Sequence, residues 1–251
     1  MRASGFAALG LAAYSVFLVA TIPAAYVAAQ VNAALPGQVE IGDAEGTLWR
    51  GSARARIAPR RAGKGIDRIE WRFLPSRLAA GEIALALHVA AEGISASGEA
   101  ARGFSQWRLR DAKAEGDASA LATLIPAIAP WRPTGRVSLT VPSLTLEGRE
   151  VRGGTLEAEW RGAVSGLSEV RPLGAYRATW RAENGPGRIV VTTLQGPLSI
   201  TGEGTTTPGL RIAFSGEARG EGDAAKALEP LLDLMGPRRP DGARTLQVRL
   251  E

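Results

Sequence analysis

The residue types that perform most nucleophilic and acid–base chemistry are scarce in this sequence. Among its 251 residues there is no cysteine, and His88 is the one histidine. A thiol nucleophile, a disulfide and a zinc site built on thiolates are therefore excluded, and catalytic triads or multi-histidine metal sites are nearly so. The segment Gly162-Ala163-Val164-Ser165-Gly166 imitates a nucleophile elbow only loosely, because its serine stands one place late and lacks a histidine partner.

The remaining candidates for chemistry are better explained as surface groups. Glu157 and Glu159 fall on one face of a predicted strand, where carboxylates meet water. His88 alternates with Leu87 and Val89, so it should point away from their apolar face. The sequence also has no phosphate-binding loop. It thus predicts a binding or scaffold protein without catalytic residues, cofactor or metal.

The basic residues are scattered along the chain. The formal net charge is +5, yet no basic run is longer than the pairs Arg60-Arg61 and Arg238-Arg239. Proteins that bind nucleic acid gather their positive charge in a patch or stripe. We therefore expect no nucleic acid among the partners.

An uncharged stretch opens the chain. From residue 3 to residue 39 no side chain is charged, and residues 5–29 are long and apolar enough to cross a bilayer. We predict a transmembrane anchor there, in which Pro23 is tolerated near the outer end. Because the nearest positive charges precede this segment, residues 1–4 should be cytoplasmic and the body exported. A signal peptide cleaved after Ala29 is the alternative. The membrane-facing side chains of the predicted anchor include Phe6, Leu11, Phe17, Ile22 and Tyr26.

After Gly46 the sequence alternates apolar and polar residues, as strands with one buried face do. Such strands suit an antiparallel sheet with one dry and one wet face. Each of the six tryptophans is followed by arginine, so we expect tryptophan on the dry face and arginine on the wet face. The exception is Trp131-Arg132, which lies between prolines and predicts a turn. The alternation is clearest at residues 135–142, 175–183, 210–215 and 245–250.

Two helical segments indicate an internal duplication. Apolar residues at helical spacing predict helices over residues 119–129 and 223–235. The first follows Glu115-Gly116-Asp117-Ala118 and the second follows Glu221-Gly222-Asp223-Ala224. Further collinear matches keep an offset of 104–108 residues. These matches favour two copies of one β-rich unit.

The predicted domains follow from these boundaries. A linker over residues 30–45 precedes β repeat 1 at residues 46–142 and β repeat 2 at residues 143–251. The expected fold is mainly β, with a single N-terminal transmembrane helix followed by a large curled antiparallel sheet and one short helix in each repeat. Two short helices cover only part of the dry face of about ten to twelve strands. Either the sheet packs on itself or an apolar ligand such as lipid covers the rest.

Two short motifs follow the apolar segment, namely Gly46-Thr47-Leu48-Trp49-Arg50-Gly51 and Trp71-Arg72-Phe73-Leu74-Pro75. Their order, spacing and place after one apolar span resemble those of the type II secretion system protein N family, the general secretion pathway N component. The resemblance extends over essentially the whole chain. We interpret the motif residues as structural markers that form a turn, two core aromatics and a strand end. They are Gly46, Thr47, Leu48, Trp49, Gly51, Trp71, Arg72 and Pro75.

The resemblance implies a bitopic inner-membrane protein with a periplasmic β domain. Such a protein is an accessory component of the apparatus that moves folded proteins across the outer membrane, and its partners are other secretion-system proteins. The family supplies no catalytic residue that can be placed on this chain. It also looks like the broader group of anchored β-groove proteins associated with lipid traffic. A periplasmic lipid-binding or lipid-transfer role is therefore the alternative function.

Overall fold

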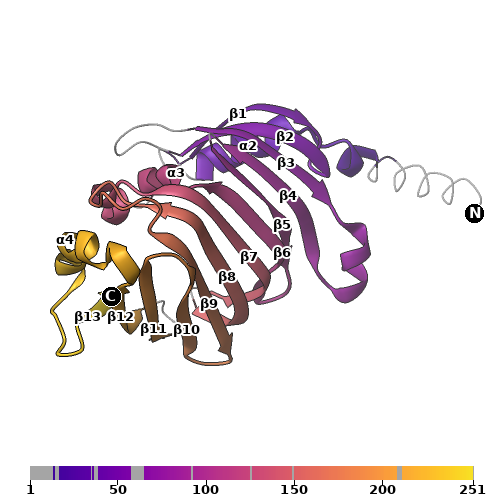
Figure 1. Cartoon of the computed structure of the whole chain (residues 1–251). Helices are drawn as coiled ribbons and strands as arrows, with labels where there is room; N and C mark the ends of the chain where they lie inside the picture. Colours follow the sequence, from indigo (N-terminus) through magenta and orange to yellow (C-terminus); the bar gives the residue numbers. More distant parts are fainter. Residues whose placement is uncertain are drawn as a thin grey trace, which may run out of the picture. The chain divides into compact units, whose positions relative to one another are not determined.

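The fold is mainly antiparallel β, as the alternation predicts (Figure 1). The computed structural model describes residues 14, 17–34, 36, 39–57, 65–91, 93–124, 126–148, 150–207 and 211–250. The chain divides into two compact units, Met1–Glu92 and Gly93–Glu251, here called unit 1 and unit 2. Each unit is described by itself.

Unit 1 contains four antiparallel strands that pair in chain order. They are β1 (Val39–Gly46), β2 (Arg50–Ile57), β3 (Gly65–Phe73) and β4 (Ile83–Ala91), and the 3-10 helix η1 (Pro75–Ala80) lies between the last two. The register places Ile69, Trp71 and Leu87 on one face of the sheet. Arg72 and His88 alternate with these residues and lie on the opposite face, which confirms the outward direction expected for His88.

The apolar N-terminal stretch is broken at Pro23. Residues 17–20 are helical, Pro23 forms a β-bridge with Thr47, and helix α2 (Ala24–Ala34) begins directly afterwards. Proline has no N–H to continue a helix, and its ring clashes with the preceding turn. Within the described residues, no helix has both the length and the apolar character that a membrane crossing requires. The single transmembrane helix predicted over residues 5–29 is not supported.

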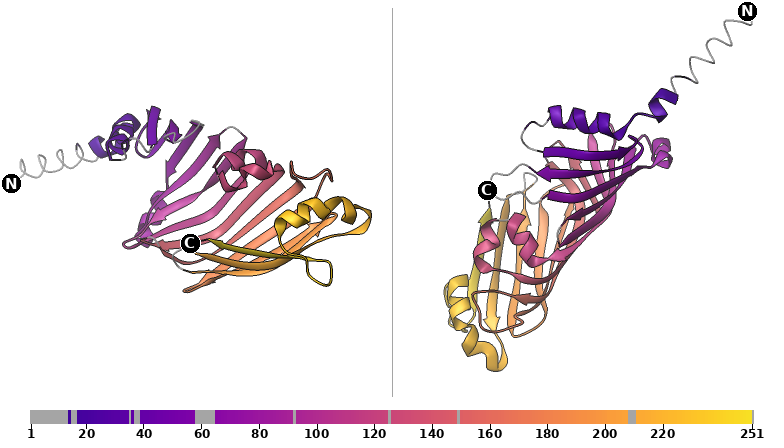
Figure 2. Two further views of the ribbon diagram at one scale, coloured as in Figure 1. Left: turned by 90° about the vertical axis from the view of Figure 1, so that its left-hand side faces the viewer. Right: turned by 90° about the horizontal axis from the view of Figure 1, so that it is seen from above.

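Helix α2 packs against β1 (Figure 2). Ala24 and Ala28, one turn apart, are the buried residues of this helix. The side-chain amide of Asn32 binds the backbone of Ile41 twice: its Nδ2 donates to the carbonyl oxygen at 2.9 Å, and the Ile41 N–H donates to Oδ1 at 2.7 Å. Asn32 therefore takes the place of a strand partner on the outer side of β1.

The segment predicted as a linker, residues 30–45, contains the end of α2 and most of β1. A shift of register between Gly42 and Glu45 interrupts the strand, and Asp43 has a positive φ of 48°. A bulge of this kind removes the two-residue period by which a strand is recognised in sequence.

Unit 2 contains nine antiparallel strands, which also pair in chain order. The strands are β5 (Ile94–Arg102), β6 (Gln106–Asp117), β7 (Thr134–Glu147), β8 (Glu150–Val164), β9 (Gly174–Glu183), β10 (Gly187–Gln195), β11 (Leu198–Thr206), β12 (Ile212–Gly220) and β13 (Arg244–Leu250). Among the described strands, β5 and β13 do not pair with each other, so the sheet of unit 2 is open. The helices are α3 (Ala118–Leu124), η2 (Pro126–Trp131), η3 (Gly222–Ala224) and α4 (Ala225–Met235).

The helices of unit 2 occupy the positions expected for them, whereas the expected repeat boundary falls inside a strand. Residues 142 and 143 both belong to β7, at a register shift between Thr140 and Ser143. Pro142 there resembles a strand end in sequence, because it cannot donate a ladder hydrogen bond. The strand–helix–strand order recurs at β6–α3–β7 and β12–α4–β13. The duplication itself stays a prediction.

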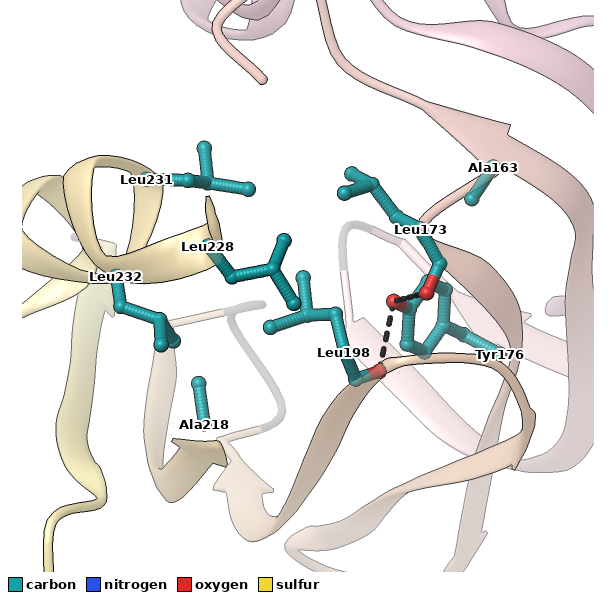
Figure 3. Packing of buried hydrophobic residues seen from close by; sticks show 8 residues of the cluster. All are labelled: Ala163, Leu173, Tyr176, Leu198, Ala218, Leu228, Leu231 and Leu232. Atoms are coloured by element: carbon teal, nitrogen blue, oxygen red, sulfur yellow. Dashed lines mark hydrogen bonds between the residues drawn. The ribbon is translucent and has the colours of Figure 1, made fainter. Parts of the chain in front are cut away.

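The core of unit 2 lies between α4 and the sheet (Figure 3). Leu228, Leu231 and Leu232 of α4 pack with Leu198 and Tyr176, and all five are buried. The Tyr176 hydroxyl lies within hydrogen-bonding distance of two backbone carbonyl oxygens, that of Leu173 at 3.2 Å and that of Leu198 at 2.9 Å. Burial raises the pKa of Tyr176. This phenol therefore stays protonated and ties β9 to the start of β11.

Candidate functional site

The first motif forms the tight connection from β1 to β2. The Thr47 N–H donates to the carbonyl oxygen of Arg50 at 2.8 Å, and the Arg50 N–H donates back to the Thr47 hydroxyl at 3.2 Å. Gly46 begins this turn with φ +86°, and a Cβ there would lie 2.5 Å from the Arg50 carbonyl oxygen. A larger residue at position 46 would be strained on both counts.

Gly51 and Trp71 join the two motifs. They face each other across β2 and β3, and a Cβ on Gly51 would lie 2.6 Å from Cζ2 of the Trp71 ring. The Trp71 indole N–H reaches the carbonyl oxygens of Thr47 and Leu48 at 3.2 and 3.1 Å. The second motif therefore satisfies backbone acceptors in the turn that the first motif makes.

Trp49 and Phe73 form a second contact between the motifs. Their ring centroids are 4.8 Å apart in an edge-to-face arrangement, and the Phe73 N–H donates to the Trp49 carbonyl oxygen at 2.6 Å. The Trp49 indole N–H donates to the Val19 carbonyl oxygen at 2.8 Å. Pro75 begins η1, and Leu74 alone separates it from the end of β3. The turn, the aromatic contacts and the strand end are all present, while both tryptophans are partly exposed rather than fully buried.

A depression of about 630 Å³ lies on the polar face of unit 1, and four motif residues contribute to it. They are Gly46, Gly51, Trp71 and Arg72. Charged and polar residues make up much of the rest of its lining: Glu45, Arg50, Ser52, Arg68, Glu70 and His88. This depression is the candidate functional site, and we call it the motif depression.

Two arginines give the motif depression its binding chemistry. Arg50 and Arg72 stand directly opposite each other on β2 and β3, both are exposed, and neither forms an ion pair with any residue that the structure describes. Like charges facing each other across a sheet are destabilising. In contrast, Arg68 is paired with Glu70 at 2.6 Å. Two free guanidinium groups side by side are suited to an incoming carboxylate or other anion.

The polar face of unit 2 carries a different arrangement, in which the charges are paired. Glu159 on β8 lies between Arg161 at 2.6 Å and Arg177 at 2.5 Å, and its side chain is only 8% exposed. The hydrogen bond from Arg177, followed by that from Arg161, holds the pKa of Glu159 below its usual value. The same contact raises the pKa of Arg177. Glu159 is therefore a buried structural anion, whereas the sequence predicts a solvated one.

The serine of the elbow-like segment has a structural task. Ser165 is buried, and its hydroxyl donates to the Trp131 carbonyl oxygen at 2.9 Å. The Ser165 hydroxyl oxygen in turn accepts a hydrogen bond from the Leu167 N–H at 3.2 Å. Within the described residues, no group of three or more histidine, aspartate or glutamate side chains is arranged to hold a metal ion. What the described sites offer is recognition through charge and hydrogen bonds.

The apolar face of unit 2 contains a second feature, a register row in which four of the six side chains are alanines, and we call this row the furrow. The furrow crosses β5 to β10 and is made of Ala96, Ala114, Leu139, Ala158, Ala178 and Val191, all of them partly exposed. Larger residues stand two positions away on the same strands, Trp160 and Tyr176 to one side and Leu156 and Trp180 to the other. The ring of Phe214 closes one end, since a Cβ on Gly202 would lie 2.5 Å from it.

The predicted anchor residues are not gathered into one element. Phe6 and Leu11 lie outside the described residues. Phe17 belongs to the short helical stretch and is 61% exposed, whereas Tyr26 lies on α2 and is 60% exposed. Between them, the Ile22 carbonyl oxygen accepts a hydrogen bond from the Leu48 N–H at 2.9 Å.

Sequence reasoning missed three residues that the structure makes prominent: Asn32, Arg50 as one of a free pair, and Arg244. Arg244 is 2% exposed at the start of β13 and contacts Glu229 and Asp233 of α4. The sequence could have identified Arg244, because it stands two residues before Leu246 and so shares a strand face with Leu246 and Val248. A charged residue on an apolar row predicts a buried ion pair.

Comparison with known proteins agrees with the motifs. Residues 37–247 match the family model for the type II secretion system (T2SS), protein N. The chain is 27% identical over 250 residues to the type II secretion system protein N of Pectobacterium carotovorum subsp. carotovorum, and the alignment covers 94% of this chain and 92% of that protein. No solved structure matches significantly. The chain therefore belongs to the type II secretion system protein N family, and it is a component of the secretion apparatus, not an enzyme.

Proposed function

We propose that this component is attached to the inner membrane by its apolar N-terminal segment and works in the periplasm. There it binds another secretion protein in the motif depression during export across the outer membrane. The observation that carries this proposal is the free pair Arg50 and Arg72, set in a depression to which the family motifs contribute. A carboxylate-bearing segment of the partner fits this pair.

Attachment to the membrane is supported by the side chains near the N-terminus. Residues 3–39 carry no charge, and the described apolar side chains Tyr14, Phe17 and Val19 are 50–61% exposed. Exposed apolar groups in a row suit contact with lipid. Alkaline carbonate should leave the full-length protein with the membranes, and protease added to spheroplasts should digest the β units. N-terminal sequencing of mature protein that begins at Gln30, or survival of the β units, would contradict this placement.

The docking role is tested by neutralising the free pair. The variant R50Q/R72Q should lose most co-purification of the full-length protein with other inner-membrane secretion components. The matched control is R136Q/R181Q in unit 2, which removes two exposed arginines that have no described ion pair. Amounts of each variant in the membrane should equal wild type. Unchanged co-purification of R50Q/R72Q, or equal loss in both variants, would show that the motif depression is not the contact.

A second function is favoured by the furrow of unit 2. At about 4.8 Å per strand, the row from β5 to β10 is about 24 Å long, which exceeds the roughly 15 Å thickness of one leaflet of a bilayer core. An acyl chain lying across the strands would cover the partly exposed alanines. In this case the protein binds or transfers phospholipid.

A variant that fills the furrow with a larger side chain tests whether the protein binds phospholipid there. Phospholipid should co-purify with gently solubilised full-length protein, measured by native mass spectrometry, and A178L should abolish it. T179L places the same bulk on the opposite face of the same strand and should leave it unchanged. The absence of lipid from the wild-type protein, or equal lipid in A178L, would exclude the furrow as a lipid site.

A further inference from the structure

The outer edge of β13 is only half covered. At its beginning, the Thr245 N–H donates to the Pro237 carbonyl oxygen at 3.0 Å, and Arg244 forms a β-bridge with Arg238. The segment before β13 therefore folds back along the first residues of the strand. No described residue covers the strand beyond Thr245 on that side.

The exposed part of the edge presents backbone groups at alternate residues. Leu246 and Val248 pair with Gly216 and Phe214 of β12. Because the Thr245 N–H points outward to Pro237, the N–H and C=O groups of Gln247 and Arg249 point outward too. No hydrogen bond joins these outward groups to any part of the chain that the structure describes. Val248 beside them is 44% exposed.

An open edge is a template for another strand, and the chain shows elsewhere how such an edge is closed. On β1 the Asn32 side chain occupies both backbone groups of Ile41. Natural sheets protect their edges by such means because free edges pair with other chains. Gln247 and Arg249 have no such cap among the described residues.

We propose that a second copy of this chain pairs with β13, edge to edge and antiparallel, around a two-fold axis at Val248. In this register Gln247 of each copy forms hydrogen-bonded pairs with Arg249 of the other, and Val248 faces Val248 in a non-hydrogen-bonded pair. Val248 of one copy thus contacts Val248 of the other on the apolar face. On the polar face, arginine meets glutamine and never arginine, which avoids the repulsion of like charges.

The covered beginning of β13 sets the length of this contact. Pro237 occupies the outer side of Thr245 in both copies, so only residues 246–250 are free to pair. Leu246 then faces residue 250 of the second copy at each end. Five residues of each copy are then paired, and four backbone hydrogen bonds join the two chains. This interface is small, so the expected dimer is weak and concentration-dependent.

The absence of cysteine makes a direct test simple, because a single introduced cysteine has no thiol partner within its own chain. A disulfide-linked product with the mass of two chains therefore reports contact between two copies. In a non-hydrogen-bonded pair the two Cα atoms lie about 4.5 Å apart, within the range of a disulfide. Full-length V248C in isolated membranes should therefore give a covalent dimer under a mild oxidant. Q247C is the control, because its two copies would lie diagonally, about 7–8 Å apart, and should cross-link poorly.

A proline variant tests the backbone pairing itself. In Q247P the lost N–H is an outward one, so pairing with β12 is retained while the edge is blocked. V248C/Q247P should lose the cross-link, and V248C/Q247A should keep it. Native mass spectrometry of solubilised wild-type protein should show two chains, and Q247P one. A monomeric V248C, a cross-link that survives Q247P, or a wild-type complex with a different protein in place of the second copy would each overturn the proposal.

Discussion

Replacing Arg244 should be far less harmful than removing the carboxylates that face it. The guanidinium is 2% exposed, and its Nη2 contacts Glu229 at 2.6 Å and Asp233 at 2.5 Å. Its Nε and Nη1 are buried without a partner among the described residues. The side chains of Glu229 and Asp233 are 38% and 67% exposed. The cation is thus buried while its anions remain in contact with water.

This asymmetry sets the magnitudes. Without both carboxylates, in E229Q/D233N, the buried cation is uncompensated, which costs about 3–5 kcal/mol. In R244M the carboxylates turn to water, and two buried nitrogen atoms without a partner among the described residues, which each cost about 1–3 kcal/mol, are removed. Methionine also fills most of the same volume. We therefore expect R244M to lie within about 1 kcal/mol of wild type, or above it in stability.

Hydrogen exchange of the full-length protein, followed by mass spectrometry, measures the difference in local stability between E229Q/D233N and R244M. A loss of 3–5 kcal/mol corresponds to exchange about 10²- to 5 × 10³-fold faster in peptides of α4 and β13. Peptides of unit 1 supply the internal reference. R54M, which removes the exposed Arg54–Asp43 pair of unit 1, should change exchange very little. If R244M accelerated exchange as much as E229Q/D233N, the reasoning about the buried cation would be refuted.

Three further predictions concern stability. G51A should loosen β2 and β3, seen as faster exchange there, because its Cβ would lie 2.6 Å from the Trp71 ring and from a backbone oxygen; unchanged exchange would contradict this. Y176F loses the hydrogen bonding of the phenol and should lower the local stability by about 1–2 kcal/mol, measured as faster exchange in peptides of α4 and β11. Unchanged exchange would show that the hydroxyl does not contribute to stability. Because the folded pKa of Glu159 is lowered, its stabilisation is present above the ordinary pKa of 4.5 and is lost as the pH falls through the folded value. In E159Q the free energy of unfolding should therefore fall less steeply than in wild type as the pH is lowered, and equal slopes in the two proteins would contradict this.

The strands were predictable where alternation is regular. Along β9, Tyr176 and Trp180 lie on the apolar face while Arg177 and Arg181 lie on the polar face, as the period of two requires. The prediction failed where a local irregularity hides that period, as at the β1 bulge after Gly42. One shifted residue exchanges the two faces, so sequence alternation cannot identify such a strand.

The candidate site was predictable in its residue types but not in its arrangement. The motifs indicated that Gly51 and Trp71 mattered, yet their contact depends on the register between β2 and β3. Sequence spacing does not set this register, because the connection between the two strands is long. Asn32 was hidden for a related reason: its partner is the backbone of Ile41, which no residue identity reveals.

The furrow and the β13 edge make a joint prediction about stoichiometry. Pairing around Val248 would keep the apolar faces of both unit 2 sheets on one side, since facing residues in a pair share a face. The furrows would still not merge. The Phe214 ring closes the furrow on β11 and β12, before β13 is reached. In this register Leu246 would also face residue 250 of the second copy, and not the Leu246 of that copy. The furrow rows of the two chains would therefore be displaced from each other along the strands by four residues, about 14 Å. The cross-linked V248C dimer should therefore bind two phospholipids, one per chain, and A178L should remove both. One lipid per dimer would show that the furrows join, which would contradict the closure by Phe214.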